Sequence, residues 1–266
     1  MKLSATDVGD GPAALLLHGQ PGSAGDWNPV AARLAGLRVI APDRPGYGQT
    51  GGRAVGFEEN AAAAIELLDR LGVESAVVAA HSWATGVALA AAIRWPDRVS
   101  GLVLAAPIAP GMPAGAFDRL LAEPLVGRAA TGVGLGFAGA ALALRPVRAL
   151  VCRALPGLRP DDLARTAAEW RGGAWRSFYV EQRALLDELP ALAPELGEVR
   201  GEVTLFQGRR DRLSSPAQAR WLAAALPRAE LLMVDGAGHL LPQQRPDLVA
   251  DAIRRAAKRA PAGHPG

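Results

Sequence analysis

The chain has 266 residues, of which half are hydrophobic and 21% are charged, and its formal net charge is +3. This composition excludes a disordered chain, and the length accommodates one large core, so we expect a soluble globular unit with an insertion. The basic residues are dispersed among acidic ones and form no stripe that could follow a phosphate backbone, so nucleic acid is not an expected partner.

Strand and helix patterns alternate along the chain. The apolar runs predicted as buried strands are residues 13–17, 37–41, 76–80, 101–106, 203–207 and 230–234. The segments predicted as helices are residues 26–36, 57–72, 84–96, 216–227 and 246–259. Parallel strands joined by right-handed helical crossovers explain this order, so the expected fold class is α/β, with a doubly wound, mostly parallel sheet.

The alternation is interrupted once, between residues 107 and 197, where helical pieces are separated by prolines. We predict that residues 107–197 form a helical cap, inserted after the strand that ends near Ala106 and lying over the C-terminal edge of the sheet. The core then comprises residues 1–106 and 198–260, and residues 261–266 are expected to be a disordered tail.

Cysteine content and apolar runs indicate the compartment. The single cysteine, Cys152, excludes an internal disulfide and a cysteine-based metal site. Residues 1–12 contain acidic residues and glycines in place of the apolar run of a signal peptide, so we expect a cytoplasmic protein. The longest uncharged run, residues 129–144, is glycine-rich and shorter than the ~18 to 20 residues of a spanning helix. We interpret it as a mobile lid and expect no stable membrane anchor.

Ser82 lies in the stretch HSWATG, after a predicted strand and before a helix of small residues. A nucleophile elbow holds its serine on a strained strand-turn-helix and needs small residues two positions away on each side, as Ala80 and Ala84 are. The usual pattern has glycines at these positions. The stretch by itself is therefore equally consistent with an ordinary connection.

Two more loops supply the partners that a nucleophilic serine requires, a base and an acid that orients the base. His239 follows the last predicted strand, and Asp211 follows the strand before it. The chain order is serine, acid, histidine, as in α/β-hydrolases. Asp235 remains an alternative acid because it is four residues from His239, whereas Asp43 fits the role of organising a turn.

The other histidines are weaker candidates for the base. His18 fits a structural role beside the loop HGQPG. His81 precedes Ser82 directly, and neighbouring strand residues face opposite sides. His264 lies in the tail.

With the segments LLLHGQPGSAGDW and RVIAPDRPGYGQTG, these loops make residues 12 to 258 resemble the α/β-hydrolase superfamily of serine hydrolases with a helical cap. That group includes small esterases, cofactor-free haloperoxidases and carbon-carbon bond hydrolases. The resemblance implies that the backbone amides of Gln20 and Trp83 form an oxyanion hole and that neither a cofactor nor a metal is required.

The predicted activity is hydrolysis of a carboxylic ester of a small or medium, largely apolar molecule by way of an acyl-enzyme. Lactones, thioesters, carbon-carbon bonds and peracid formation remain open on the same residues, and the alternative from another class is a ligand-binding protein without turnover. Arginines and acids in the cap roughly balance, so no anionic substrate is implied. Packing of the cap explains most of its aromatic residues, and one or two of them are expected to line the substrate pocket. These candidates are Trp170, Trp175, Phe178 and Tyr179.

Overall fold

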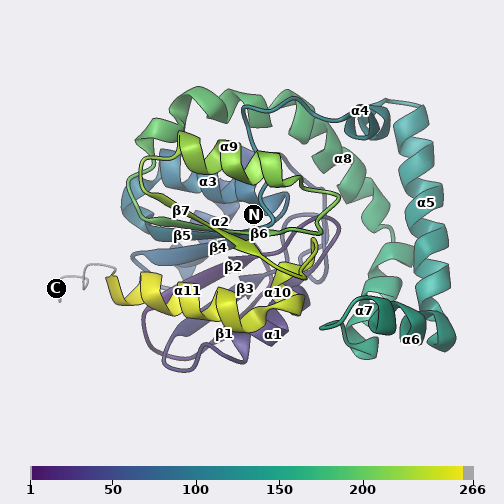
Figure 1. Ribbon diagram of the computed structural model, residues 1–266, viewed down its shortest axis with the longest axis horizontal. Coiled ribbons are helices and arrows are strands. Elements are labelled where there is room, and N and C mark those ends of the chain that lie inside the picture. Colours follow the sequence, from purple (N-terminus) through teal and green to yellow (C-terminus); the bar gives the residue numbers. More distant parts are fainter. Residues whose placement is uncertain (1, 260–266) are drawn as a thin grey trace.

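The computed structural model describes residues 2–259 and contains a seven-stranded sheet with helices on both faces (Figure 1). The strand order is β1-β3-β2-β4-β5-β6-β7, and all neighbouring pairs are parallel except β1 with β3. The predicted doubly wound, mostly parallel α/β sheet is confirmed. Its strands are β1 (Ala5–Val8), β2 (Ala13–Leu17), β3 (Arg38–Pro42), β4 (Ala76–His81), β5 (Val99–Ala105), β6 (Val203–Gly208) and β7 (Ala229–Val234).

Helices cover both faces of the sheet, so the central strands are buried on both sides. All six residues of β4 are buried, and its side chains alternate between two separate cores, with Val78 in one and Val77 in the other. This explains why the strand has no polar alternation in its sequence. One face carries α2 (Phe57–Arg70), α3 (Ala84–Arg94) and α9 (Pro216–Ala225), and the other carries α1 (Asn28–Ala31), α10 (Leu241–Gln244) and α11 (Pro246–Arg259).

Two elements of the core differ from the prediction. Strand β1 was not expected, because it is a short edge strand whose residues are mostly exposed and include a polar pair, Thr6 and Asp7. The helix expected over residues 26–36 is reduced to a 3-10 turn, η1 (Ala24–Trp27), and one turn of α1. Arg33 and Leu34 donate to carbonyls three residues back, which tightens the chain into turns toward β3.

The segment from 107 to 197 contains five α-helices that lie beside the C-terminal edge of the sheet (Figure 1). The name cap is used below for residues 107–197. The predicted tail, residues 261–266, lies outside the described residues. The helices of this segment are α4 (Ala116–Ala122), α5 (Val126–Ala143), α6 (Arg145–Ala154), α7 (Pro160–Arg171) and α8 (Ala174–Asp187), followed by the 3-10 helix η3 (Leu189–Glu198).

Candidate active site

Ser82 stands on a sharp turn between β4 and α3. Its backbone φ is 53°, a left-handed conformation that residues with a side chain rarely adopt. The Ser82 N–H donates to the carbonyl of Ala105 at 2.9 Å, which ties the turn to the neighbouring strand β5. Ala80 and Ala84 are completely buried, so larger side chains would not fit beside the turn. This is the geometry of a nucleophile elbow.

The imidazole of His239 connects Ser82 to an acid. His239 Nε2 lies 2.9 Å from Ser82 Oγ, and its Nδ1 lies 2.9 Å from Asp211 Oδ2. The three residues come from the loops after β4, β6 and β7, which share the C-terminal edge of the sheet. The structure therefore brings together the serine, histidine and aspartate predicted from the sequence.

Asp211 is buried and held by several donors. Its Oδ1 accepts hydrogen bonds from the backbone N–H groups of Leu213 at 2.8 Å and Ser214 at 3.0 Å, and its Oδ2 accepts one from the Gln207 amide at 3.1 Å. Burial tends to raise the pKa of this carboxyl, but the hydrogen bond and charge of His239, with the two backbone donors, outweigh burial and lower it. Asp211 is therefore ionised at neutral pH.

The other acids lie elsewhere. Asp235 forms an ion pair with Arg209 at 2.7 Å, and its side chain is 88% exposed. Asp43 accepts hydrogen bonds from two backbone N–H groups, each at 2.8 Å, and so organises the turn that contains it. The structure thus places Asp211, and neither alternative, against His239.

The loop that contains Gly19 and Gln20 borders the serine. A Cβ atom at Gly19 would lie 3.3 Å from Ser82 Cβ, so only glycine lets the backbone come this close. No described residue accepts a hydrogen bond from the backbone N–H of Gln20 or of Trp83. The peptide bond between Gln20 and Pro21 is cis. Two unpaired donors beside a nucleophile are the components of an oxyanion hole.

The remaining described histidines have structural partners. His81 Nε2 donates to the backbone carbonyl of His239 at 2.9 Å, and burial, with the nearby charge of His239, lowers the pKa of His81 to about 3. His18 lies between the Gly19 carbonyl at 2.8 Å and the Arg44 N–H at 3.0 Å, and burial lowers its pKa well below the ordinary value. Both rings are neutral at physiological pH and hold loops in place.

A buried ion pair joins the cap to the loop after β3, and no sequence pattern indicated it. Glu181 of α8 pairs with Arg44, which follows β3, and the two side chains are 0% and 1% exposed. Tyr47 donates to Glu181 Oε2 at 2.7 Å. The indole of Trp83 donates to the Glu181 carbonyl at 3.0 Å and stacks on Phe57 with ring centroids 4.1 Å apart. Cap, elbow and core loop are thus linked through one residue, Glu181, by its carboxylate and its backbone carbonyl.

The same arginine supports the loop that contains Gly19 and Gln20. Arg44 donates to the backbone carbonyl of His18 at 2.8 Å and to that of Gly19 at 3.0 Å. These bonds fix the chain immediately before Gln20. The loop is therefore held from below by a side chain that is itself neutralised by the cap.

A cavity of about 400 Å³ lies between the candidate site and the cap, and His239, Gly19 and Gln20 line it on the side of the core. The largest group of its lining residues is aliphatic and comes from the cap and from the loops after β6 and β7. The sequence did not indicate these residues, because nothing but helix packing decides which side of a cap helix faces inward. The aliphatic wall consists of Leu142, Val151, Leu155, Leu158, Leu163, Leu213 and Leu240.

The four cap aromatics divide between different surfaces. Trp170 and Phe178 line this cavity, as proposed for part of the group. Tyr179 is not part of the wall, and Trp175 instead borders a separate hollow on the outer side of α5, together with Arg128.

One polar patch interrupts the apolar wall. Arg165 of α7 lies 3.5 Å from Asp26, 3.2 Å from Asp162 and 3.8 Å from Glu169. Burial raises the pKa of Asp26 to about 6. Burial, reinforced by the charge of Asp26, raises the pKa of Glu169 to about 7 against the attraction of Arg165. Three carboxyl groups surround one guanidinium, so the patch offers no net positive charge to a substrate.

We expect Glu169→Gln to reduce the pH dependence of stability. Because the pKa rises from 4.5 to about 7 on folding, the folded protein keeps a proton that the unfolded chain releases, and stability falls as pH rises through this window. The side chain is 21% exposed, so we expect an effect of about 1 to 2 kcal/mol. Urea unfolding at about pH 5 and about pH 8 measures it. Asp161→Asn is the exposed control, and equal pH slopes for wild type and Glu169→Gln would contradict the raised pKa.

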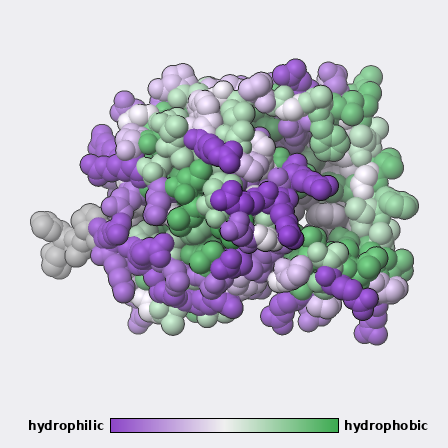
Figure 2. All heavy atoms as spheres, viewed as in Figure 1, coloured by the Kyte–Doolittle hydropathy of each residue, from purple (hydrophilic) through white to green (hydrophobic). Residues whose placement is uncertain are grey.

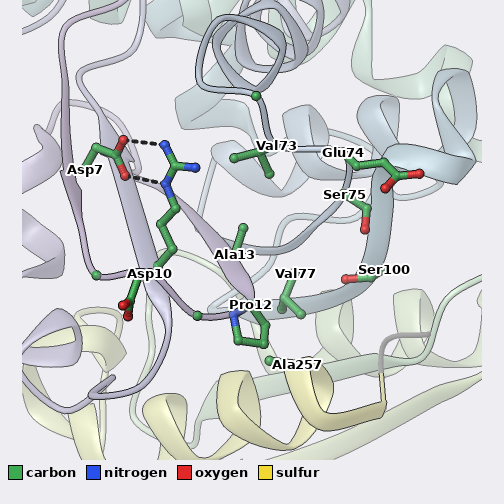
Figure 3. A pocket seen from close by; sticks show the side chains of 14 residues that line it. Asp7, Asp10, Pro12, Ala13, Val73, Glu74, Ser75, Val77, Ser100 and Ala257 are labelled. Carbon is green, nitrogen blue, oxygen red and sulfur yellow. Dashed lines mark hydrogen bonds and ion pairs between the residues drawn. The ribbon is translucent and has the colours of Figure 1, made fainter. Parts of the chain in front are cut away.

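A hollow at the opposite edge of the sheet lacks comparable chemistry. It measures about 590 Å³ and lies among the N-terminal ends of the strands, with the Asp7–Arg38 ion pair on its rim (Figure 3). Ser75 and Ser100 line it, but no histidine does. Within residues 2–259, no group of three or more His, Cys, Asp or Glu side chains is arranged to hold a metal ion.

Comparisons with known proteins identify the family of the chain. Residues 14–252 match the family described as "Alpha/beta hydrolase family". The chain is 26% identical to a 2-hydroxy-6-oxo-6-phenylhexa-2,4-dienoate hydrolase of Burkholderia cepacia, over 90% of this chain and 85% of that protein. It is 29% identical to a 2-hydroxymuconate semialdehyde hydrolase of Pseudomonas putida, over 88% of this chain and 82% of that protein.

In three dimensions the chain is similar to a thermophilic esterase from Thermogutta terrifontis, with a TM-score of 0.75 and 22% identity over 97% of this chain and 94% of that one. At this level of identity, the likeness shows the fold alone. The family match, which covers most of the sequence, shows that the chain belongs to the α/β-hydrolase family and is a hydrolase.

Proposed function

We propose that the protein hydrolyses carboxylic esters of small or medium, largely apolar molecules through an acyl-enzyme on Ser82. The observation that carries the proposal is the pair of 2.9 Å contacts that runs from Ser82 Oγ through the His239 ring to Asp211. A protein that only binds a ligand has no need of a strained serine, a base and a buried acid in this order.

In the proposed reaction, His239 takes the proton of Ser82 as Oγ attacks the carbonyl carbon. The amides of Gln20 and Trp83 stabilise the oxyanion, an interaction worth about 3 kcal/mol for each donor. His239 then protonates the leaving alcohol. Water, deprotonated by His239, releases the acid from the acyl-enzyme, while Asp211 orients the ring and stabilises its charged form.

The cavity supports a neutral, largely apolar substrate. Its volume of about 400 Å³ and its aliphatic wall suit a short or medium acyl or alcohol group. Arg165, its one lining cation among the described residues, already has Asp26 and Asp162 as partners. A carboxylate in the substrate would meet carboxylates of the protein.

Carbon-carbon bond hydrolysis is the second candidate, and the two relatives described above favour it. They are similar to this chain over most of its length, and their names state the cleavage of a dienoate and of a muconate semialdehyde. The acidic groups around Arg165 argue against an anionic dienoate in this cavity.

Opening of epoxides and displacement of halide are not supported, although epoxide hydrolases and a haloalkane dehalogenase are also similar to parts of the chain. A serine that attacked an epoxide or a haloalkane carbon would form an ether. Water would not hydrolyse that product at this site, so the enzyme would stop after one turnover.

A substrate panel tests the proposal. p-Nitrophenyl esters of increasing acyl length are compared with lactones, thioesters and a 2-hydroxy-6-oxo-dienoate, and the free enzyme is also treated with a fluorophosphonate probe. Fast turnover of short and medium esters with labelling of the protein is the expected result. Fast cleavage of the dienoate with slow ester hydrolysis would assign carbon-carbon chemistry instead. Failure of the folded wild type to label or to turn over any substrate would overturn the hydrolytic role of Ser82.

The assignment of the acid can be tested separately. We expect Asp211→Asn to lower kcat for ester hydrolysis by about 10⁴-fold, because an amide no longer fixes the tautomer of His239 or stabilises its charged form. Asp235→Asn is the matched control, since Asp235 is exposed and paired with Arg209. Steady-state kinetics on a p-nitrophenyl ester measures both, and a large loss in the control with a small one in Asp211→Asn would reverse the assignment.

A further inference from the structure

The outer face of the cap holds most of the exposed apolar side chains of the molecule. Among the described residues, eleven large hydrophobic side chains are exposed, and nine of them lie between residues 117 and 155. Figure 2 shows hydrophobic side chains along the right-hand edge of the molecule, which α5 occupies in Figure 1. Nine exposed large hydrophobic side chains on one part of a monomeric protein are unusual, and such a cluster indicates a surface that contacts another molecule or a membrane.

The face is built around α5. Val126, Ala130, Val133, Phe137 and Leu144 recur at helical spacing and are all exposed, so they form one apolar stripe along this helix and the residue after it. At 1.5 Å per residue the stripe is about 27 Å long. Val133 and Phe137, at its centre, are 73% and 77% exposed.

Helix α5 lies along α7 and α8 at the outer side of the cap. By length and composition it is long and apolar enough to cross a membrane, and 17% of it is buried. Its other side packs against α7 and α8, where Gly139 comes so close to Trp170 that a Cβ atom would lie 3.1 Å from the tryptophan side chain. A helix that is held along its length in this way and apolar on its free side is suited to lie in an interface plane.

Most charges around the stripe are positive, and the exposed acidic exception is Glu123, which lies shortly before α5. Residues 124–159 contain five arginines and no acidic residue, although the whole chain carries a formal charge of only +3. Arg128 lies in the first turn of α5, and Arg145 and Arg153 belong to α6, so exposed arginines stand at both ends of the stripe. Arg148 is different, because it donates to the last carbonyls of α5 and has a structural role.

A shallow hollow adds an aromatic residue to this surface. It measures about 520 Å³ and is lined by Leu125, Val133 and Trp175, with Arg128 among them. The guanidinium groups of Arg128 and Arg176 lie 5.9 Å and 4.6 Å from the Trp175 ring centroid. Tryptophan and arginine next to apolar surface are the residues favoured at the boundary between lipid tails and headgroups.

We propose that this face, formed by α5, α6 and the Trp175 hollow, docks reversibly on the surface of an anionic lipid bilayer. The apolar stripe would enter the acyl boundary while the arginines meet the negative headgroups. A second copy of the chain is disfavoured as the occupant, because a symmetric contact would place the two arginine clusters against each other. Such docking is peripheral and requires no spanning helix.

The docked face is continuous with the catalytic cavity. Leu155 is 40% exposed on the outer surface and also lines the cavity, and Leu142 of α5 and Val151 of α6 belong to the same wall. When the cap is docked on the bilayer, this side of the cavity wall would therefore face the lipid. If the proposed ester hydrolysis is correct, esters dissolved in the bilayer would reach Ser82 through this side; the docking itself does not depend on that activity.

Vesicle flotation of the full-length protein tests the proposal. We expect the wild type to float with vesicles of phosphatidylcholine and phosphatidylglycerol in equal parts, to float weakly with phosphatidylcholine alone, and to be released by high salt. The double variant Val133→Ser/Phe137→Ser should lower the apparent affinity about tenfold or more. Arg145→Glu/Arg153→Glu should abolish the preference for phosphatidylglycerol.

Matched changes on the core serve as controls. Val8→Ser removes an apolar side chain that is 62% exposed on β1, and Arg200→Glu reverses a charge that is 70% exposed. Both should bind vesicles like the wild type. All variants change exposed residues, and their thermal unfolding shows whether they fold.

Three outcomes would overturn the proposal. The first is absence of binding to both kinds of vesicle, and the second is equal binding by folded cap variants and wild type. The third is a dimer in sedimentation that Val133→Ser/Phe137→Ser dissociates, without vesicle binding, because it would show that a second copy covers the face. Loss of ester hydrolysis in Ser82→Ala, with vesicle binding intact, separates docking from catalysis.

Discussion

Ser82→Ala is expected to lower kcat for ester hydrolysis by about 10⁴- to 10⁶-fold and to abolish labelling by a fluorophosphonate. The hydroxyl is the only group of the elbow that can form the acyl-enzyme, and the oxyanion donors alone leave a small residual rate. The substitution removes only the hydroxyl and adds no atom to the turn, whose φ is 53°. The variant should therefore fold and still bind substrate, and the loss should be in kcat.

Ser100→Ala is the matched control, because Ser100 lies on β5 at the opposite edge of the sheet and lines the hollow described there. It should be labelled and should turn over substrate like the wild type. Labelling of folded Ser82→Ala at the wild-type rate would show that another residue is the nucleophile.

Glu181→Ala is expected to lower the free energy of unfolding by about 3 to 5 kcal/mol. The substitution leaves the Arg44 guanidinium buried without its partner and also removes the acceptor of the Tyr47 hydroxyl. Burial raises the pKa of Glu181 while Arg44 opposes that rise, so the two side chains depend on each other. Urea unfolding followed by tryptophan fluorescence gives the change in free energy.

Glu195→Ala provides the comparison for an ion pair near the surface. Glu195 pairs with Arg94, and both side chains are 36% exposed, so the expected loss is much smaller than in Glu181→Ala. The double variant Arg44→Met/Glu181→Leu, which removes both charges, should be more stable than Glu181→Ala. A loss in Glu181→Ala as small as that in Glu195→Ala would contradict the buried ion pair.

The sheet could be predicted from sequence because its central strands are covered on both faces and are therefore apolar throughout, as in β4. The edge strand β1 could not, since Ala5–Val8 is mostly exposed and has no such run. The first helix was predicted too long, because apolar periodicity continues to Leu34 although the chain there has already turned toward β3.

The candidate site could be predicted from the sequence because of the topology of the sheet. Ser82, Asp211 and His239 each follow a parallel strand, and all such strand ends share one edge. Sequence favoured Asp211 by its loop position and by the family resemblance, but it left Asp235 as an alternative, because Asp235 also follows a strand. The direction of each side chain decides it, and Asp235 extends into solvent to Arg209.

The cap was the least predictable part. Whether Trp170 or Trp175 faces the cavity depends on how α5, α7 and α8 pack, and a helical pattern does not specify this. Because arginines and acids are roughly equal in number over the whole cap, composition did not reveal that they are unevenly distributed along it. Residues 124–159 contain five arginines and no acid, whereas the acids of the cap lie before this stretch, at Asp118 and Glu123, and from Asp161 onward.

The way the cap is attached bears on how this enzyme could acquire a new specificity. The chain leaves the sheet at the end of β5 and returns in β6, and these strands are direct neighbours in parallel register. A different helical segment could thus be exchanged between them without changing the order of the sheet. Arg44 limits that freedom. A replacement segment without a carboxylate at the position of Glu181 would leave the buried Arg44 guanidinium unpaired next to the loop that contains Gly19. Evolution of a new substrate range by exchange of the cap therefore has to keep the carboxylate that pairs with Arg44 while it changes the residues that line the cavity.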